Sequence, residues 1–170
     1  MKYKRYQITY LALLLGLGMV CGVVRAEPPH AYPFGNYDAA VARAAKSNKK
    51  IFLYYGRQGC GFCDMTNKNS FSKDSVKQRY LKNYELVYLD AEGGGRLTLA
   101  NGERITEQQF GARFKVLGTP YFVFFEPDGT LIYKAPGFKT EKDLIQMDEY
   151  IQGKHYKNKS FNDFSKEQKL

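Results

Sequence analysis

Two cysteines, Cys60 and Cys63, are the residues of this sequence whose type and spacing could do chemistry. They are separated by Gly61 and Phe62 and follow a continuous apolar run at residues 51–55 (IFLYY). Two thiols at this spacing can form a reversible disulfide, hold part of a metal site, or brace the chain. The function depends on which of these three roles applies.

The position of Cys60 favours redox chemistry. The apolar run predicts a central strand covered on both faces, and residues 63–71 can continue as a helix. Cys60 would then lie at a helix N-terminus, where free backbone N–H groups and the helix dipole lower the pKa of a thiol. Cys63 would follow on the same side, one turn further and less exposed. We therefore expect Cys60 to attack a substrate disulfide and Cys63 to resolve the mixed disulfide, which makes both candidate catalytic residues.

The metal alternatives have weaker support. A closed zinc site needs about four ligands, and beyond the first 26 residues the chain adds only His30 and His155, each near one end. Haem attachment would place a His after the second cysteine, where this sequence has Asp64. A two-thiolate copper(I) site is chemically possible, so a non-catalytic copper(I)-thiolate carrier is the alternative function. We predict no resident metal and no cofactor besides the Cys60–Cys63 disulfide.

The first 26 residues are typical of a cleavable secretory signal. A basic start precedes an apolar stretch from Ile8 to Val24, and small residues end at Ala26. The alternative is an uncleaved membrane anchor, because about 17 apolar residues is the short limit for a spanning helix. Both interpretations export the rest of the chain, which predicts a periplasmic location where disulfide chemistry is available.

The basic charge is mostly a property of the C-terminal tail. Removing the signal lowers the formal net charge from +9 to +5 and leaves Cys60 and Cys63 as the only cysteines. Five of the remaining lysines lie in the last 17 residues, against two acidic residues. This pattern favours a solvated tail over a nucleic-acid surface. We predict a monomer that does not bind nucleic acid.

The remaining sequence predicts one α/β domain, with a mixed central β-sheet flanked by helices on both faces. We divide it into an entry segment at 27–37, the domain at 38–152 and a loosely ordered tail at 153–170. Strands separated by helices need parallel crossovers, and Pro127-Asp128-Gly129 predicts a later antiparallel hairpin. Gly93-Gly94-Gly95 is interpreted as a mobile loop, because no Lys-Ser/Thr pair follows as in a phosphate-binding loop. Helices are expected at 37–50, 63–71, 75–84, 106–114 and 141–151, and strands at 51–55, 84–91, 121–125 and 131–137.

Residues 38–151 resemble the thioredoxin superfamily, on the strength of CGFC after a strand and of GTP just ahead of the strand YFVFF. More narrowly, YLDAEGG, NGE and GTPYFVFFEPDGTLIYKAPGF are similar to exported bacterial thioredoxins of the SoxW type and to the C-terminal domain of the transmembrane thiol reductase DsbD. The resemblance implies a thioredoxin fold with a cis bond before Pro120, packed against the cysteines. It also implies that Thr119 offers its backbone to an incoming substrate strand. Gly59 and Phe62 are expected to complete the substrate-binding surface.

Two departures from the family pattern bear on mechanism. Gly59 stands where thioredoxins usually carry Trp, so the apolar contact surface must come from Phe62, Tyr55 and Phe138. Tyr54 stands where many thioredoxins have a buried Asp that takes the second cysteine's proton. We expect water or another carboxylate, such as Glu126, to take this proton instead.

The residues between the cysteines bear on the direction of electron flow. Family oxidants often place a His there, which stabilises the thiolate, whereas Phe62 cannot donate a hydrogen bond. The pair should therefore be less oxidising than those. The sequence predicts an exported thiol–disulfide oxidoreductase that reduces disulfides of exported proteins and is itself kept reduced by a membrane thiol donor of the DsbD type.

Overall fold

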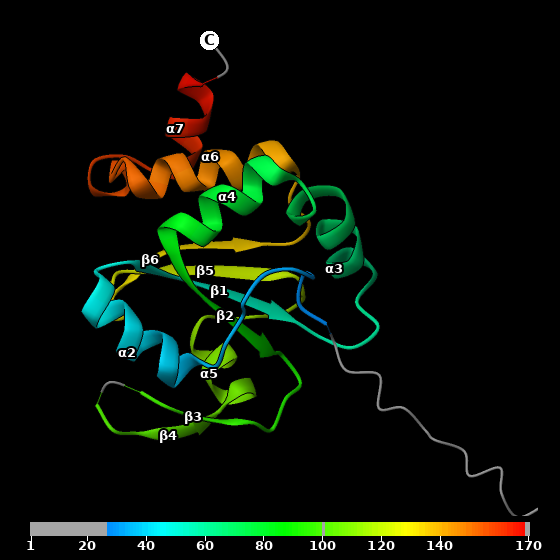
Figure 1. The fold of residues 1–170 in the computed structure, drawn as a ribbon, viewed down its shortest axis with the longest axis vertical. Coiled ribbons are helices and arrows are strands. Elements are labelled where there is room, and N and C mark those ends of the chain that lie inside the picture. Colours follow the sequence, from blue (N-terminus) through cyan, green and yellow to red (C-terminus); the bar gives the residue numbers. More distant parts are fainter. Residues whose placement is uncertain (1–26, 100, 169–170) are drawn as a thin grey trace, which may run out of the picture.

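A four-stranded mixed sheet, in the order β2-β1-β5-β6, forms the centre of the computed structural model, which describes residues 27–99 and 101–168 (Figure 1). Strand β1 pairs in parallel with β2 and antiparallel with β5, and β5 pairs antiparallel with β6. The predicted thioredoxin fold with a mixed sheet is confirmed. The strands are β1 (Lys50–Gly56), β2 (Tyr84–Asp90), β5 (Tyr121–Phe125) and β6 (Leu131–Pro136).

Helices cover both faces of this sheet, as predicted. Helices α2 and α5 lie on one face, and α3, α4 and α6 lie on the other (Figure 1). Thr106 and Thr140 form the predicted capping boxes of α5 and α6 with Gln109 and Asp143. The helices are α2 (Tyr37–Ser47), α3 (Gly61–Thr66), the π-helix η1 (Asn67–Phe71), α4 (Asp74–Asn83), α5 (Glu107–Arg113) and α6 (Glu141–Gln152).

Strand β1 contributes to the hydrophobic core on both sides of the sheet. Phe52 and Tyr54 point into the cluster under α4 and α6, whereas Ile51, Leu53 and Tyr55 point into the cluster under α2 and α5. All five side chains are fully buried. Alternate residues of a strand face opposite sides, so the continuous apolar run in the sequence is what a doubly covered strand requires.

The interpretation of residues 93–106 as a loop was incomplete. Strands β3 (Arg96–Thr98) and β4 (Arg104–Thr106) follow the glycines and form a two-stranded antiparallel sheet. Leu97 and Ile105 are paired across it and buried against the α2 and α5 side of the core. Each strand has a single buried apolar residue, which is too short a pattern to show a period of two.

The prediction of a loosely ordered tail was wrong for most of residues 153–170. A 3-10 helix η2 (His155–Lys157) and helix α7 (Phe161–Glu167) follow α6. Ser160 caps α7 by accepting a hydrogen bond from the N–H of Asp163. Phe164 is buried and packs against Tyr150 of α6 with a ring separation of 5.5 Å. Aromatic side chains therefore anchor a segment whose lysines suggested a solvated tail.

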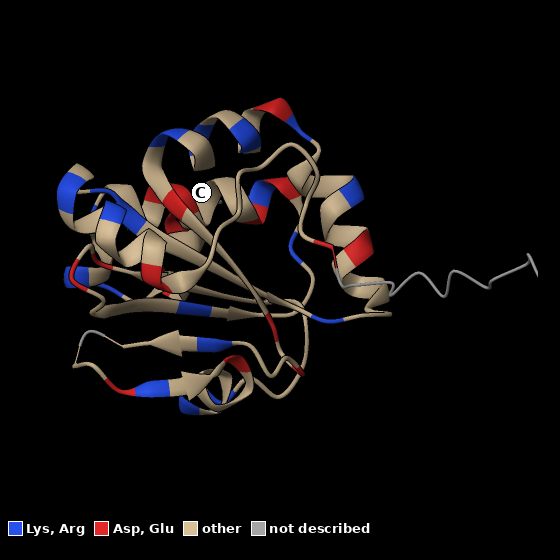
Figure 2. Ribbon diagram, turned by 60° about the horizontal axis from the view of Figure 1, so that its bottom comes forward, with Lys and Arg blue, Asp and Glu red and all other residues tan. Residues whose placement is uncertain are grey.

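Two features of the described residues bear on membranes and on charged partners: the length and polarity of the helices, and the distribution of charge. Within residues 27–99 and 101–168, no helix is both long and apolar enough to cross a membrane. The predicted signal at residues 1–26 lies outside the described residues. In Figure 2 the acidic and basic residues are interspersed over the helices and the small sheet.

Replacing Phe164 tests whether the C-terminal helix is part of the folded domain. We expect Phe164→Ala to lower the free energy of unfolding by about 3 kcal/mol, since a buried aromatic ring and its contacts are lost. The exposed neighbour Asn162 provides the control, and Asn162→Ala should change it by less than about 0.5 kcal/mol. Urea unfolding followed by circular dichroism measures both, and equal midpoints for the two variants would mean that α7 does not stabilise the domain.

Candidate functional site

Cys60 and Cys63 form a disulfide at the carboxyl end of β1, where α3 begins. Their Cα atoms are 5.2 Å apart. Cys60 is the N-cap of α3, and its Sγ accepts a hydrogen bond of 3.1 Å from the backbone N–H of Cys63. The predicted placement of the first cysteine at a helix N-terminus is therefore confirmed. An N–H group aimed at this sulfur stabilises a thiolate there.

The expected difference in exposure between the two cysteines is not seen in this disulfide state. Cys60 is 6% exposed and Cys63 is 5% exposed. Both belong to the hydrophobic cluster on the α4 and α6 side of the sheet. What distinguishes Cys60 is its set of hydrogen-bond donors.

Thr119 and Pro120 lie against the disulfide although they are far from it in the sequence. The Oγ1 of Thr119 donates a hydrogen bond of 3.2 Å to Cys60 Sγ. The peptide bond between Thr119 and Pro120 is cis. Gly137, which follows β6, donates its N–H to the carbonyl of Pro120 at 2.8 Å. Pairing of Tyr55 with Tyr121 between β1 and β5 brings these segments together.

Exposed apolar side chains lie in the segments that carry the disulfide and the cis proline. Phe62 is 61% exposed and Leu117 is 96% exposed, and Met65 of α3 is also exposed. Gly59 has a φ of +68°, with no atom within 4 Å of an added Cβ, so backbone conformation rather than space calls for glycine there. The proposal of Tyr55 as a contact residue was wrong, because its side chain is fully buried.

The charged groups near the cysteines are partly paired. Arg57, which we expected to add positive charge near Cys60, has its guanidinium 3.7 Å from the carboxylate of Glu92. Asp64, beside Cys63, lies on the exposed side of α3. The groups that contact Cys60 Sγ directly are the backbone N–H of Cys63 and the Thr119 hydroxyl.

Glu126 cannot take the proton of Cys63, so that suggestion was wrong. It follows Phe125, which pairs with Ile51 at the start of β1, whereas the cysteines follow the end of β1. Glu126 accepts a hydrogen bond from the hydroxyl of Tyr156 instead. The carboxylate lies at the opposite end of the strands from the disulfide.

Two residues of this site were missed by sequence reasoning. Asn67 accepts a hydrogen bond from the hydroxyl of buried Tyr54, and its spacing of four from Cys63 could have pointed to it. Leu117 had no comparable signal, because exposure of an apolar side chain depends on how the chain folds around it.

The comparisons with known proteins agree with this geometry. A family model described as a thioredoxin-like domain matches residues 37–152. The chain belongs to the thioredoxin-like family. Comparison with curated proteins finds no match.

Solved structures of thioredoxin-like proteins share the fold at low sequence identity. A thioredoxin-fold protein from Helicobacter pylori is 20% identical, with a TM-score of 0.60, over 72% of this chain and 81% of that chain. A disulfide isomerase described as putative, from Bacteroides thetaiotaomicron, is 19% identical, with a TM-score of 0.57, over 72% and 93%. The reduced C-terminal domain of DsbD from Neisseria meningitidis is 20% identical, with a TM-score of 0.50, over 65% and 90%. The narrower likeness to the SoxW type stays a prediction.

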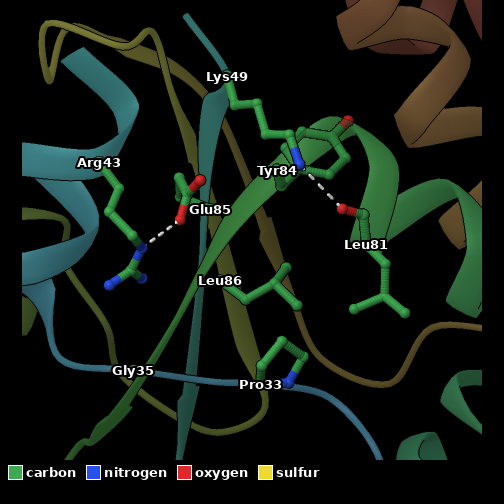
Figure 3. Close-up of a pocket in the computed structure, with 8 residues that line it drawn as sticks. All are labelled: Pro33, Gly35, Arg43, Lys49, Leu81, Tyr84, Glu85 and Leu86. Carbon is green, nitrogen blue, oxygen red and sulfur yellow. Dashed lines mark hydrogen bonds and ion pairs between the residues drawn. The ribbon is translucent and has the colours of Figure 1, made fainter. Parts of the chain in front are cut away.

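The thioredoxin-like fold places the disulfide away from the cavity shown in Figure 3. That cavity lies beside the first residues of β2, where Arg43 pairs with Glu85 at 2.6 Å. Lys49 donates to the carbonyl of Leu81. Both basic side chains that line the cavity therefore already have partners. The cavity contributes no residue to the site around the disulfide. Nor do the described residues hold three or more His, Cys, Asp or Glu side chains arranged for a metal ion.

The hydroxyl of Thr119 should tune the reactivity of Cys60. A donor to sulfur stabilises the thiolate, so Thr119→Val should raise the pKa of the Cys60 thiol by about one pH unit. The pH dependence of iodoacetamide alkylation of the reduced protein measures this shift. Thr119→Ser keeps the hydroxyl and should behave like the unsubstituted protein. An unchanged midpoint in Thr119→Val would show that the hydrogen bond does not act on the thiolate.

Proposed function

We propose that this thioredoxin-like protein is an exported thiol–disulfide oxidoreductase that reduces disulfides of extracytoplasmic proteins. The observation that carries the proposal is the Cys60–Cys63 disulfide, with a backbone N–H and the Thr119 hydroxyl both donating to Cys60 Sγ. Two donors to one sulfur favour its thiolate, which is the attacking form.

Cys60 and Cys63 act in sequence. The Cys60 thiolate attacks a sulfur of the substrate disulfide, that S–S bond breaks, and the departing substrate sulfur takes up a proton. Cys63 then loses its proton and attacks Cys60 Sγ, which releases the second substrate sulfur as a thiolate. The substrate disulfide is reduced, and Cys60 and Cys63 are oxidised to the disulfide seen in the structure.

The substrate lies along the cis Thr119–Pro120 segment. Thr119 offers its backbone to an extended substrate strand, in the manner of β-strand addition. Phe62, between the two cysteines, and Leu117, two residues before Thr119, present exposed apolar area to such a strand. Gly59 has open space around it and lets the substrate backbone approach Cys60.

We expect electrons to flow from the Cys60–Cys63 dithiol to the substrate disulfide. The two residues between the cysteines, Gly61 and Phe62, have no side-chain donor to stabilise the reduced pair further. A pair without this stabilisation is less oxidising. A membrane thiol reductant of the DsbD type would regenerate the dithiol, and the predicted signal at residues 1–26 would deliver the protein to the periplasm as a monomer.

A Cys63→Ser variant tests the proposed reaction. Insulin serves as the model protein disulfide, and the reduced variant should accumulate a mixed disulfide through Cys60, because the resolving thiol is missing. Non-reducing electrophoresis and intact mass measure the adduct. The matched Cys60→Ser variant should trap at least about tenfold less, since the two hydrogen-bond donors that stabilise a thiolate are directed at Cys60 Sγ.

Two other results bear on the alternatives. The unsubstituted protein with dithiothreitol should cleave insulin catalytically and leave no lasting adduct. Absence of both the adduct and the cleavage, together with one copper(I) bound per Cys60–Cys63 pair, would overturn the enzyme and support the copper(I)-thiolate carrier.

A further inference from the structure

Tyr54 and Asn67 form a hydrogen-bonded pair on the side of the disulfide that faces the hydrophobic core, which we call the inner side. Tyr54 is fully buried in the same hydrophobic cluster as Cys60 and Cys63. Its hydroxyl donates a hydrogen bond of 3.1 Å to Oδ1 of Asn67. Asn67 begins η1, and its backbone N–H donates to the carbonyls of Cys63 and Asp64. Residues four apart lie on one face of a helix, so Asn67 lies one turn beyond Cys63.

The same asparagine joins a third segment to this point. Its Nδ2 donates to the carbonyl of Glu27 at 3.3 Å. Asn67 therefore connects the helix that carries both cysteines to strand β1 through Tyr54 and to the entry segment through Glu27. Both side-chain contacts of Asn67 are made to groups without charge.

No buried carboxylate accompanies this pair in the part of the chain that the structure describes. Asp148 is the one carboxylate among the buried polar residues there, and it accepts hydrogen bonds from Tyr84, Asn83 and Arg79. Tyr84 pairs with Lys50 at the first position of β1. The cysteines follow the other end of that strand, about 20 Å away at 3.3 Å per residue.

The groups that face Tyr54 also keep it neutral. Burial raises the pKa of Tyr54 well above its ordinary value, and Tyr88 of β2 and the exposed carboxylate of Asp64 on α3 raise it further. The rings of Phe71 and Phe122 pack on Tyr54 from η1 and β5. The phenol therefore stays a hydrogen-bond donor to Asn67 throughout the neutral pH range.

We propose that the Tyr54–Asn67 pair is a neutral positioning device that fixes Cys63 and keeps the inner side of the redox pair uncharged. It rests on the proposed function. When Cys63 attacks Cys60 in the mixed disulfide, the Cys63–Cys60 bond forms, the bond to the substrate sulfur breaks, and the thiol proton of Cys63 leaves to solvent. Tyr54 and Asn67 hold the geometry of this step without accepting the proton.

Two isosteric substitutions on the same π-helix test the uncharged inner side. Asn67→Asp puts a carboxylate against Tyr54, and Asn69→Asp adds the same charge on the exposed side of η1. A nearby negative charge disfavours a thiolate. In Asn67→Asp we expect the pKa for alkylation of Cys60 to rise by at least about one pH unit. The reduction potential of the Cys60–Cys63 pair, measured against glutathione, should fall by about 30 mV for each tenfold change in the equilibrium constant between dithiol and disulfide. Asn69→Asp should stay close to the unsubstituted protein in both measurements.

Equal shifts in the two Asp variants would overturn the neutral-pair proposal while leaving the enzyme intact. If the unsubstituted protein fails to equilibrate with glutathione at all, the proposed function itself fails. The two failures are thus distinguished by the behaviour of the unsubstituted protein.

A second pair of variants covers the case in which Asn67→Asp does not fold. Tyr54→Phe removes the hydroxyl that binds Asn67, and Tyr80→Phe removes an equally buried hydroxyl that binds the carbonyl of Leu144. Loss of the positioning contact should slow glutathione release from the Cys60 mixed disulfide several-fold in Tyr54→Phe alone. Equal release rates in the two variants would overturn the positioning role.

Discussion

Strand β1 is buried on both faces of the sheet, and the position of the redox pair follows from that burial. Each fully buried apolar side chain of this size contributes roughly 1.5–3 kcal/mol relative to exposure. A register slip of one residue would exchange the two sets of side chains between the faces, so the strand cannot shift against β2 or β5. At Gly56, the last residue of β1, an added Cβ would overlap the phenol of Tyr88, so a larger residue there would require the Tyr88 side chain to move. The cysteines come immediately after this point.

The chemistry of Cys60 then depends on groups that the sheet brings together from distant parts of the chain. The helix that begins after Cys60 supplies a backbone N–H, and the antiparallel pairing of β1 with β5 supplies the Thr119 hydroxyl. Beneath the pair, Tyr54 and Asn67 contribute polar groups without charge. All three of these hydrogen bonds are made by groups without charge, so we expect hydrogen bonds rather than buried charge to set the reactivity of Cys60.

Much of this arrangement could be predicted from the sequence, because its signals are local. The apolar run at residues 51–55, the two cysteines and the capping boxes at Thr106 and Thr140 each specify a short segment, and each has its predicted place in the structure. The resemblance of residues 118–120 to the family motif pointed to the region that contacts Cys60. These signals are sufficient for the fold and for the position of the cysteine pair within it.

The remainder depended on contacts between segments that no local pattern reports. Phe164 anchors a lysine-rich tail through contacts with rings of other elements, such as Tyr150 of α6. Glu126 was a reasonable proton acceptor by residue type, but the strand register places it at the wrong end of the sheet. Asn67 matters because Tyr54 faces it, and Leu117 because nothing in the described fold covers it.

The reduction potential of the Cys60–Cys63 pair tests the central claim most directly. The protein would be equilibrated against graded glutathione buffers, and the fraction of free thiols would be read from the mass added by alkylation. The account predicts a value near or below about −200 mV, in the range of thioredoxins and glutaredoxins. A value near about −120 mV would reverse the direction and make the protein a disulfide donor. A pair that never equilibrates would contradict the redox function itself.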